Sequence, residues 1–235
     1  MTTWRGSGTR VTREGPGQAR RGAGPRLPAG AGTGTAGERD RVYPRGAELV
    51  WRGHRVLAKT AGMEVVLSVP SAADAAEFIE AVRASRALHR PWLDLPDTPG
   101  LFAVYLDRSA REDQANYLIR HRACGGLVGV VNVSNIVRGG LQSGFMGYGA
   151  FASHAGRGLM TEGLRAVLDA VFGPLRLHRV EANIQPGNAR SIALVRRLGF
   201  EREGFSRRYL KIGGDWRDHE RWALLAEDWA ARAGR

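Results

Sequence analysis

The spacing of hydrophobic and polar residues divides the chain from Met63 onward into alternating strands and helices. Segments with β-branched or alternating apolar residues are typical of strands, and they predict strands at 63–69, 115–122, 127–137, 142–151 and 178–184. Apolar residues three and four positions apart are typical of amphipathic helices, and they predict helices at 72–89, 99–110, 158–172 and 188–199. A closing hairpin is expected over 200–212 and 216–226. This order of elements predicts an α+β fold with a mixed, mostly antiparallel sheet and flanking helices.

The N-terminal quarter differs in composition from the rest of the chain. Residues 1–46 contain eleven glycines, four prolines and few apolar side chains, so burial cannot offset the entropy that ordering would cost. We therefore predict a disordered basic tail over 1–46, a lead-in segment with a short strand and a turn over 47–62, and one folded domain over 63–229.

Positive charge is concentrated in the same N-terminal part. The chain has a net charge of +12, and residues 1–62, with twelve basic and four acidic side chains, carry +8 of it. Such a segment is either a solvated arginine-rich tail or an arm that contacts RNA or the ribosome. The sequence has no apolar run of about 18 residues and no secretory signal. We therefore expect a cytoplasmic protein without membrane contact.

A glycine-containing loop before the helix at 158–172 is the first candidate for a binding site. Gly156 and Gly158 let main-chain amides approach a ligand without obstruction by a Cβ atom, and Arg157 adds a positive charge. The unpaired N–H groups and the positive dipole end at a helix start attract phosphate. The glycines are equally compatible with a simple turn, and the complete P-loop pattern is absent.

A second segment, about thirty residues further on, combines with this loop. A strand leads into Pro186-Gly187-Asn188-Ala189-Arg190-Ser191, and the helix that follows ends in Leu198-Gly199-Phe200. Asn188 alone is a good helix N-cap. Together, the two segments resemble the acetyl-CoA-binding core of the GNAT acetyltransferase superfamily.

Other segments narrow this resemblance to the RimJ/RimL branch of the superfamily. They are Arg90-Pro91-Trp92, residues 131–139 and residues 213–219. The similarity is closest to the RimJ type, the ribosomal-protein-alanine N-acetyltransferases, and it covers roughly 63–229. It implies the GNAT fold with a splayed central strand pair, acetyl-CoA as co-substrate, and a protein N-terminus as acceptor, with a ribosomal protein as one such acceptor.

The resemblance also assigns cofactor-binding residues. The strand at 145–148 is expected to bind the pantetheine arm, and the amides of residues 155–160 to hold the pyrophosphate. The residues implied are Met146, Gly147, Tyr148, His154, Ala155, Gly156, Arg157, Gly158, Leu159, Met160, Asn188 and Ser191. Ser153 stands where the superfamily often has Gln or Arg, so His154 or Arg157 is expected to compensate at that edge of the site.

The expected reaction is direct attack of a neutral amine on the thioester, without an enzyme nucleophile. Related N-terminal acetyltransferases have a catalytic Glu where this chain has Asn183, an amide that cannot act as a base. Glu181 shares its face of the strand and could act through a water molecule. Some relatives have a Tyr that acts as the general acid where this chain has Val195. Tyr209 or Ser191 is then left to act as the general acid.

The remaining polar residues give weaker expectations. Asn132, Asn135 and Arg138 either recognise the substrate N-terminus or satisfy a sheet edge. The six histidines are scattered, without His-x-x-x-His spacing or a nearby carboxylate at ligand spacing, so we predict no metal. With a single cysteine, Cys124, we expect neither an internal disulfide nor a cysteine-based zinc site, and we interpret it as an inert surface residue.

Three hypotheses for the function therefore stand at this point. The first is an N-acetyltransferase that acts on protein N-termini. The second is an acetyltransferase for a small amine, such as an antibiotic or a polyamine. The third is a basic module that binds RNA or the ribosome and has a vestigial acetyl-CoA site.

Overall fold

The structure is a computed structural model that describes residues 49–51, 54–56 and 62–233, within the unit Glu38–Arg235. The tail predicted over 1–46 lies outside the described residues. Within the lead-in segment predicted over 47–62, two short strands, β1 (Leu49–Trp51) and β2 (His54–Val56), pair antiparallel. None of the described helices is long and apolar enough to cross a membrane.

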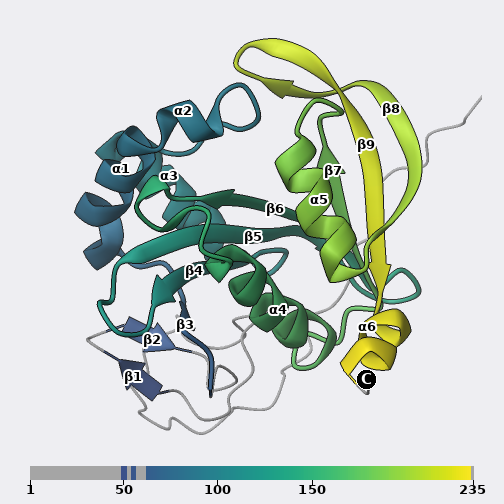
Figure 1. The fold of residues 1–235 in the computed structure, drawn as a ribbon, viewed down its shortest axis with the longest axis horizontal. Coiled ribbons are helices and arrows are strands. Elements are labelled where there is room, and N and C mark those ends of the chain that lie inside the picture. Colours follow the sequence, from purple (N-terminus) through teal and green to yellow (C-terminus); the bar gives the residue numbers. More distant parts are fainter. Residues whose placement is uncertain (1–48, 52–53, 57–61, 234–235) are drawn as a thin grey trace, which may run out of the picture. The chain divides into compact units, whose positions relative to one another are not determined.

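The described strands form one mixed sheet (Figure 1), as the α+β prediction requires. The sheet has the order β1-β2-β3-β4-β5-β6-β7-β9-β8. The further strands are β3 (Val65–Ser68), β4 (Ala115–His121), β5 (Leu127–Val137), β6 (Ser143–Ala150), β7 (Arg179–Ile184), β8 (Glu201–Ile212) and β9 (Asp215–Leu225). Neighbouring strands are antiparallel, except for β6 and β7, which are parallel.

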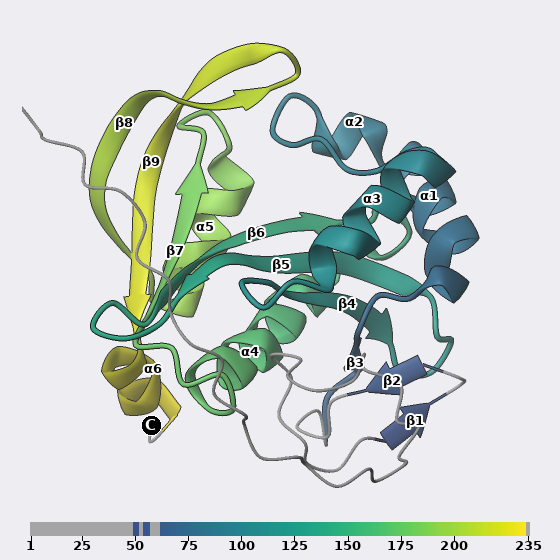
Figure 2. The same cartoon turned by 180° about the vertical axis from the view of Figure 1, so that it is seen from behind.

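The helices cover both faces of the sheet. They are α1 (Ala75–Ala84), α2 (Arg86–His89), α3 (Pro99–Ser109), α4 (Leu159–Phe172), α5 (Ala189–Leu198) and α6 (Ala226–Ala233). Figure 1 shows α4 and α5 in front of the sheet, and Figure 2 shows α1 and α3 on the opposite face. Two separate clusters of buried apolar residues correspond to these two faces.

Two helical predictions need correction. The helix predicted over 72–89 is broken at Ser85, because the Ser85 hydroxyl donates to the carbonyl of Ala81 at 2.6 Å and accepts from the amide of Ala152 at 2.9 Å. The chain therefore turns between α1 and α2. The C-terminal helix α6 was not predicted, since Trp229 is its one large apolar residue and it directly follows β9.

The most important feature for the site is the divergence of β6 and β7. The two strands pair only over Ser143–Phe145 and Arg179–Glu181. Beyond that point β6 stays paired with β5 as far as Ala150, whereas β7 stays paired with β9 as far as Ile184. Figure 1 shows β7 turning away from β6 at a steep angle. This geometry confirms the splayed strand pair that the resemblance implied.

Candidate functional site

A cleft of about 1110 Å³ lies at the divergence of β6 and β7. Its walls come from α2 and the loop after it, the end of β6, the loop that begins α4, and α5. The lining residues are 87–89, 92–93, 148–150, 154–156, 158–161, 187–191, 194 and 197. The cleft therefore brings together the two segments that the sequence singled out.

The loop that begins α4 presents a row of unpaired amides to this cleft. Gly156 and Gly158 have φ values of +80° and +81°, a conformation that glycine adopts without steric cost. Within the described chain, the amides of residues 156–160 have no hydrogen-bond acceptor, whereas those of Thr161 and Glu162 donate to the carbonyl of Gly158. Such a row at a helix N-terminus is suited to bind phosphate.

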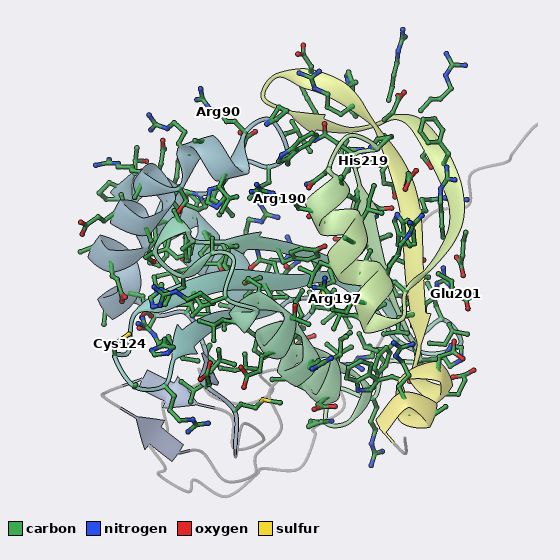
Figure 3. All side chains as sticks on the ribbon, in the orientation of Figure 1. Arg90, Cys124, Arg190, Arg197, Glu201 and His219 are labelled. Carbon is green, nitrogen blue, oxygen red and sulfur yellow. The ribbon has the colours of Figure 1, made fainter. Side chains whose placement is uncertain are left out.

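Two arginines of α5 add positive charge to the same cleft. Arg190 and Arg197 line it with exposed side chains, and Arg197 Nη1 lies 3.5 Å from the hydroxyl of Thr161. Figure 3 shows both residues on α5, with Arg190 at its beginning. No lining residue in the described part of the chain is an Asp or a Glu. The cleft is therefore electrostatically suited to a polyanion.

The beginning of α5 is fixed by two hydrogen bonds at the mouth of the strand gap. Asn188 Oδ1 accepts from the amide of Ser191 at 3.2 Å, which makes Asn188 the N-cap of the helix. The Tyr148 hydroxyl donates to the carbonyl of Ser191 at 3.3 Å. Burial raises the pKa of Tyr148 to about 12, so its hydroxyl stays protonated and bridges β6 to α5 across the gap.

The opposite wall is held by α2 and the loop that follows it. The buried His89 donates from Nε2 to the carbonyl of Ala150 at 2.8 Å, and burial lowers the pKa of its imidazole. Gln185 Nε2 lies 3.2 Å from the carbonyl of Trp92, to which it donates. A Cβ atom at Gly187 would lie 3.2 Å from the Trp92 ring. These contacts join the loop after β7 to the loop after α2.

Most of the predicted cofactor-binding residues line the cleft. Those that do are Tyr148, His154, Ala155, Gly156, Gly158, Leu159, Met160, Asn188 and Ser191. Met146 instead packs in the core against the α4 side of the sheet. Gly147 and Arg157 are exposed and are not among the lining residues. The structure thus places the side chains of Met146 and Arg157, and the Cα atom of Gly147, outside the cleft wall.

The predicted catalytic carboxylate and amide lie on the other face of the sheet from α4 and α5. Val180, Ala182 and Ile184 of β7 belong to the core on the α4 side, so the alternate residues Glu181 and Asn183 face away from it. Glu181 accepts from Arg179 Nε at 3.0 Å, and Arg179 also pairs with Glu203. Asn183 Oδ1 is buried and has no partner among the described residues. Neither residue lines the cleft.

The candidate acid Tyr209 lies on β8 and is also absent from the cleft wall. Its ring packs edge-on against His219, with centroids 6.0 Å apart. His219 is buried, its Nδ1 donates to the carbonyl of Arg217 at 2.9 Å, and burial lowers the pKa of its imidazole. Ser191 does line the cleft, so of the two candidates only Ser191 is close to the Tyr148 bridge.

The three predicted acceptor-binding residues are not brought together. Asn132 Oδ1 accepts from the hydroxyl of Tyr105 on α3 at 3.0 Å. Asn135 is exposed, with φ at +50°. Arg138 donates to the carbonyl of Leu175. Only Asn132 points to the face that carries Glu181 and Asn183, because its cross-strand partner Gly147 is two residues beyond Phe145, the partner of Glu181.

Sequence reasoning missed several residues that the fold brings to the site. His89, Arg190 and Arg197 line the cleft, and only the two arginines gave a signal, by their position on the polar side of α5. A cluster of His121, Cys124 and His154 was also missed. The prediction of no metal considered local spacing, whereas His154 lies thirty residues beyond Cys124.

Comparisons with known proteins agree with this geometry. Residues 64–201 match the acetyltransferase (GNAT) domain family. The probable N-acetyltransferase YjcK of Bacillus subtilis is 38% identical over 124 residues, which is 53% of this chain and 68% of that protein. The [ribosomal protein uS5]-alanine N-acetyltransferase of Escherichia coli is 44% identical over 103 residues, 44% of this chain. That match spans 53% of the E. coli protein, about half of its length.

A solved structure extends the likeness over most of the described fold. Mycobacterium smegmatis RimJ in complex with CoA-disulfide has a TM-score of 0.64 and 30% identity, and the match covers 77% of this chain and 93% of that one. The ribosomal-protein-S5-alanine acetyltransferase of Vibrio fischeri, at 24% identity, has a TM-score of 0.63, and the match covers 71% of this chain and 95% of that one. This second likeness concerns the fold alone.

Proposed function

The chain belongs to the GNAT acetyltransferase family, and we propose that it transfers the acetyl group of acetyl-CoA to the α-amino group of a protein N-terminus. One observation carries the proposal. A row of unpaired amides and two cleft arginines lie beside a gap between parting strands. A long ligand with phosphates at one end and a reactive group at the other fits such an arrangement.

The residues present fit acetyl-CoA in three respects. The unpaired amides of residues 156–160 are suited to hold a pyrophosphate, and Arg190 and Arg197 complement its charge. A Cβ atom at Gly156 or Gly158 would meet no atom within 4 Å, so the space over the loop is open. Beyond Phe145, β6 has no strand partner on its β7 side in the described sheet, so its main chain can pair with a pantetheine arm.

Acetyl-CoA supplies an activated acyl group, and the residues of the chain orient the amine that attacks it. Glu181 and Asn183 lie on the face of β7 that points away from the core on the α4 side, and in this proposal the acceptor approaches from that face. The buried, unpartnered Oδ1 of Asn183 is suited to accept a hydrogen bond from the incoming amine. Glu181, held by Arg179, is the candidate to take the proton through water.

A strong base is not required for this acceptor. A protein α-amino group has a pKa of about 8, so a substantial neutral fraction exists near neutral pH. The main-chain amides at the start of the gap, in residues 146–148, are candidates to stabilise the thioester oxygen. Ser191 and Tyr209 remain predictions for protonation of the leaving thiolate, and only Ser191 lines the cleft.

A named relative indicates which acceptor class to test first. The E. coli relative is named as an alanine N-acetyltransferase of ribosomal protein uS5. A ribosomal protein with N-terminal alanine is therefore the first acceptor to test, and the basic segment 1–62 is proposed to contact the ribosome in the cytoplasm.

Titration calorimetry with acetyl-CoA tests the cofactor site. In Gly158→Ala the left-handed backbone becomes strained by roughly 1 kcal/mol or more, which displaces the amide row, so we expect weaker binding. Gly139→Ala is the matched control, because Gly139 has φ at +69°, has no atom within 4 Å of its Cβ position, and lies in the β5–β6 loop. Equal dissociation constants in the two variants would contradict the proposed phosphate site.

Mass spectrometry of acceptors tests the substrate class. We expect acetyl-CoA-dependent gain of one acetyl group on the α-amino group of a peptide that begins with Ala, and none on the same peptide with a blocked N-terminus. Spermine and an aminoglycoside are the competing acceptors. Acetylation of either in preference to the peptide would support the small-amine hypothesis instead, and no acetylation of any acceptor would favour a non-catalytic binding module.

A further inference from the structure

The turn between β4 and β5 lies close to the short helical turn before α4, although the two are distant in the sequence. His121 ends β4, Cys124 lies in the turn to β5, and His154 ends the short helical turn Ala152–His154 between β6 and α4. Figure 3 shows Cys124 at this end of the sheet, far from Arg190 and Arg197. His121 and His154 are half-buried and Cys124 is exposed. One possible ligand atom from each residue lies within 4.8 Å of the other two.

The distances fit a metal ion held between these atoms. Cys124 Sγ lies 3.1 Å from His121 Nδ1 and 3.8 Å from His154 Nε2. Zinc binds thiolate sulfur at about 2.3 Å and imidazole nitrogen at about 2.0 Å, and a tetrahedral angle between them separates the two ligand atoms by about 3.5 Å. The two observed separations lie on either side of this value.

The surroundings orient His154 for this role. Its Nδ1 lies 3.0 Å from the Ser153 hydroxyl and 3.1 Å from the carbonyl of Leu127. In the tautomer that donates from Nδ1 to this carbonyl, Nε2 keeps a lone pair for a metal ion. Histidine ligands of metals usually have such a second hydrogen bond, which fixes the tautomer and the ring. Gly126 keeps the space open, since a Cβ there would lie 3.1 Å from the His154 ring and 3.5 Å from Cys124 Sγ.

We propose that His121 Nδ1, Cys124 Sγ and His154 Nε2 bind Zn²⁺, with solvent at the fourth position. One thiolate with two imidazoles is a donor set that suits zinc better than Mg²⁺ or Ca²⁺. The half-exposed position gives the ion an entry path. The proposal differs from the expectations of no metal and of an inert cysteine, both of which considered only neighbours in the sequence.

The position of the site gives it a consequence for the cleft, which rests on the proposed function. His154 directly precedes the loop whose amides face the cleft, and it lines the cleft itself. A metal that fixes His154 reduces the freedom of this loop. Zn²⁺ and acetyl-CoA should therefore each raise the affinity of the other by the same factor.

Spectroscopic titration of the untagged full chain with Co²⁺ alone tests the metal site. Cys124 is the only cysteine of the sequence, so a thiolate-to-cobalt charge-transfer band reports on this residue. We expect a band at one equivalent that Zn²⁺ abolishes. Cys124→Ser should remove the band, and His121→Asn and His154→Asn should each weaken binding by about tenfold or more. His178→Asn is the control, because His178 is exposed and pairs with Glu227 elsewhere.

A second measurement keeps the proposal testable if a variant folds poorly. Zn²⁺ should slow alkylation of Cys124 by iodoacetamide in the unmodified protein. Absence of the cobalt band, a band that the histidine variants leave unchanged, or alkylation that Zn²⁺ does not slow would each overturn the site. An acetyl-CoA affinity that is equal with and without Zn²⁺ would overturn only the coupling. Because the cobalt band needs no acetyl-CoA, its absence says nothing against the acetyltransferase.

Discussion

Asn188 connects the local structure of α5 to the cleft through a single side-chain bond. Its Oδ1 caps the helix by accepting from Ser191, and the carbonyl of Ser191 accepts in turn from Tyr148 on β6. Loss of the cap therefore disturbs both the helix start and the bridge across the strand gap. A substitution of Asn188 should therefore change both the free energy of unfolding and the affinity for acetyl-CoA.

We predict that Asn188→Ala lowers the free energy of unfolding by about 1 kcal/mol and weakens acetyl-CoA binding by about fivefold. Urea denaturation and calorimetry measure the two effects. Thr98→Ala is the control, because Thr98 also caps a helix, accepting from the amide of Leu101 at 3.3 Å, but on α3 away from the cleft. Acetyl-CoA binding that weakens equally in both variants would argue against a role of Asn188 in the site.

The buried residues His89 and His219 make the stability of the protein depend on pH. Burial lowers the pKa of both imidazoles in the folded protein below the ordinary value of 6.5. Below that value the unfolded chain binds more protons than the folded one, so stability falls as the pH falls from 6.5 toward the folded pKa values.

We predict that the free energy of unfolding is lower at pH 5.5 than at pH 7.5, and that His89→Gln and His219→Gln each flatten this dependence. Urea denaturation across the pH range measures the slope. The double variant should be flatter than either single variant, since the two residues lie on different elements. An unchanged slope in the double variant would show that other groups cause it.

The sequence predicted the structural role of a residue where that role depends only on its neighbours in the chain. The cap at Asn188 and the left-handed Gly199 that ends α5 depend only on residues of the same turn. The bond from His89 to the carbonyl of Ala150 joins residues 61 positions apart. The His121, Cys124 and His154 cluster likewise forms only when two loops meet. Periodicity and spacing carry no information about such pairs, so the sequence left them undetermined.

At the scale of elements, the close approach of α4 to the sheet depends on one glycine. A Cβ atom at Gly163 would lie 2.4–2.8 Å from three atoms of the Ile119 side chain on β4. Ile119 is fully buried in the core, so it has little room to move. Helix α4 and its amide row are thus positioned by a contact that permits no side chain.

We predict that Gly163→Ala destabilises the protein by about 1–3 kcal/mol through overpacking, despite the higher helix propensity of alanine. Gly100→Ala on α3 is the control, because Gly100 has no atom within 4 Å of its Cβ position. That substitution should be neutral or stabilising by up to about 1 kcal/mol. Urea denaturation compares the two, and equal stability would show that α4 can shift without cost.

The order and type of most elements followed from hydrophobic periodicity, since strands such as β5 and helices such as α4 have strong patterns. The positions where a helix breaks or a strand leaves its partner did not follow from this periodicity. The break at Ser85 depends on a bond to the amide of Ala152, 67 positions away. The divergence of β6 and β7 was expected only from the family resemblance, because a strand pattern does not say where its partner leaves it.

At the scale of the whole molecule, the cleft is confined to one continuous part of the chain. Its described lining residues all lie between Ala87 and Arg197, whereas +8 of the net charge of +12 belongs to residues 1–62. The two proposed binding functions, for acetyl-CoA and for the ribosome, are therefore carried by different parts of the sequence, and a truncation can separate them.

We predict that deletion of residues 1–46 leaves the dissociation constant for acetyl-CoA within about twofold of that of the full chain, but strongly weakens binding to ribosomal RNA. The logarithm of the RNA affinity of the full chain should fall linearly with the logarithm of salt concentration, because each phosphate contact releases counterions, and the truncated chain should show a smaller slope. Calorimetry and filter binding measure the two affinities. RNA binding that survives the deletion with an unchanged salt slope would place the basic surface in the folded domain, where the cleft arginines Arg190 and Arg197 would be the next residues to substitute.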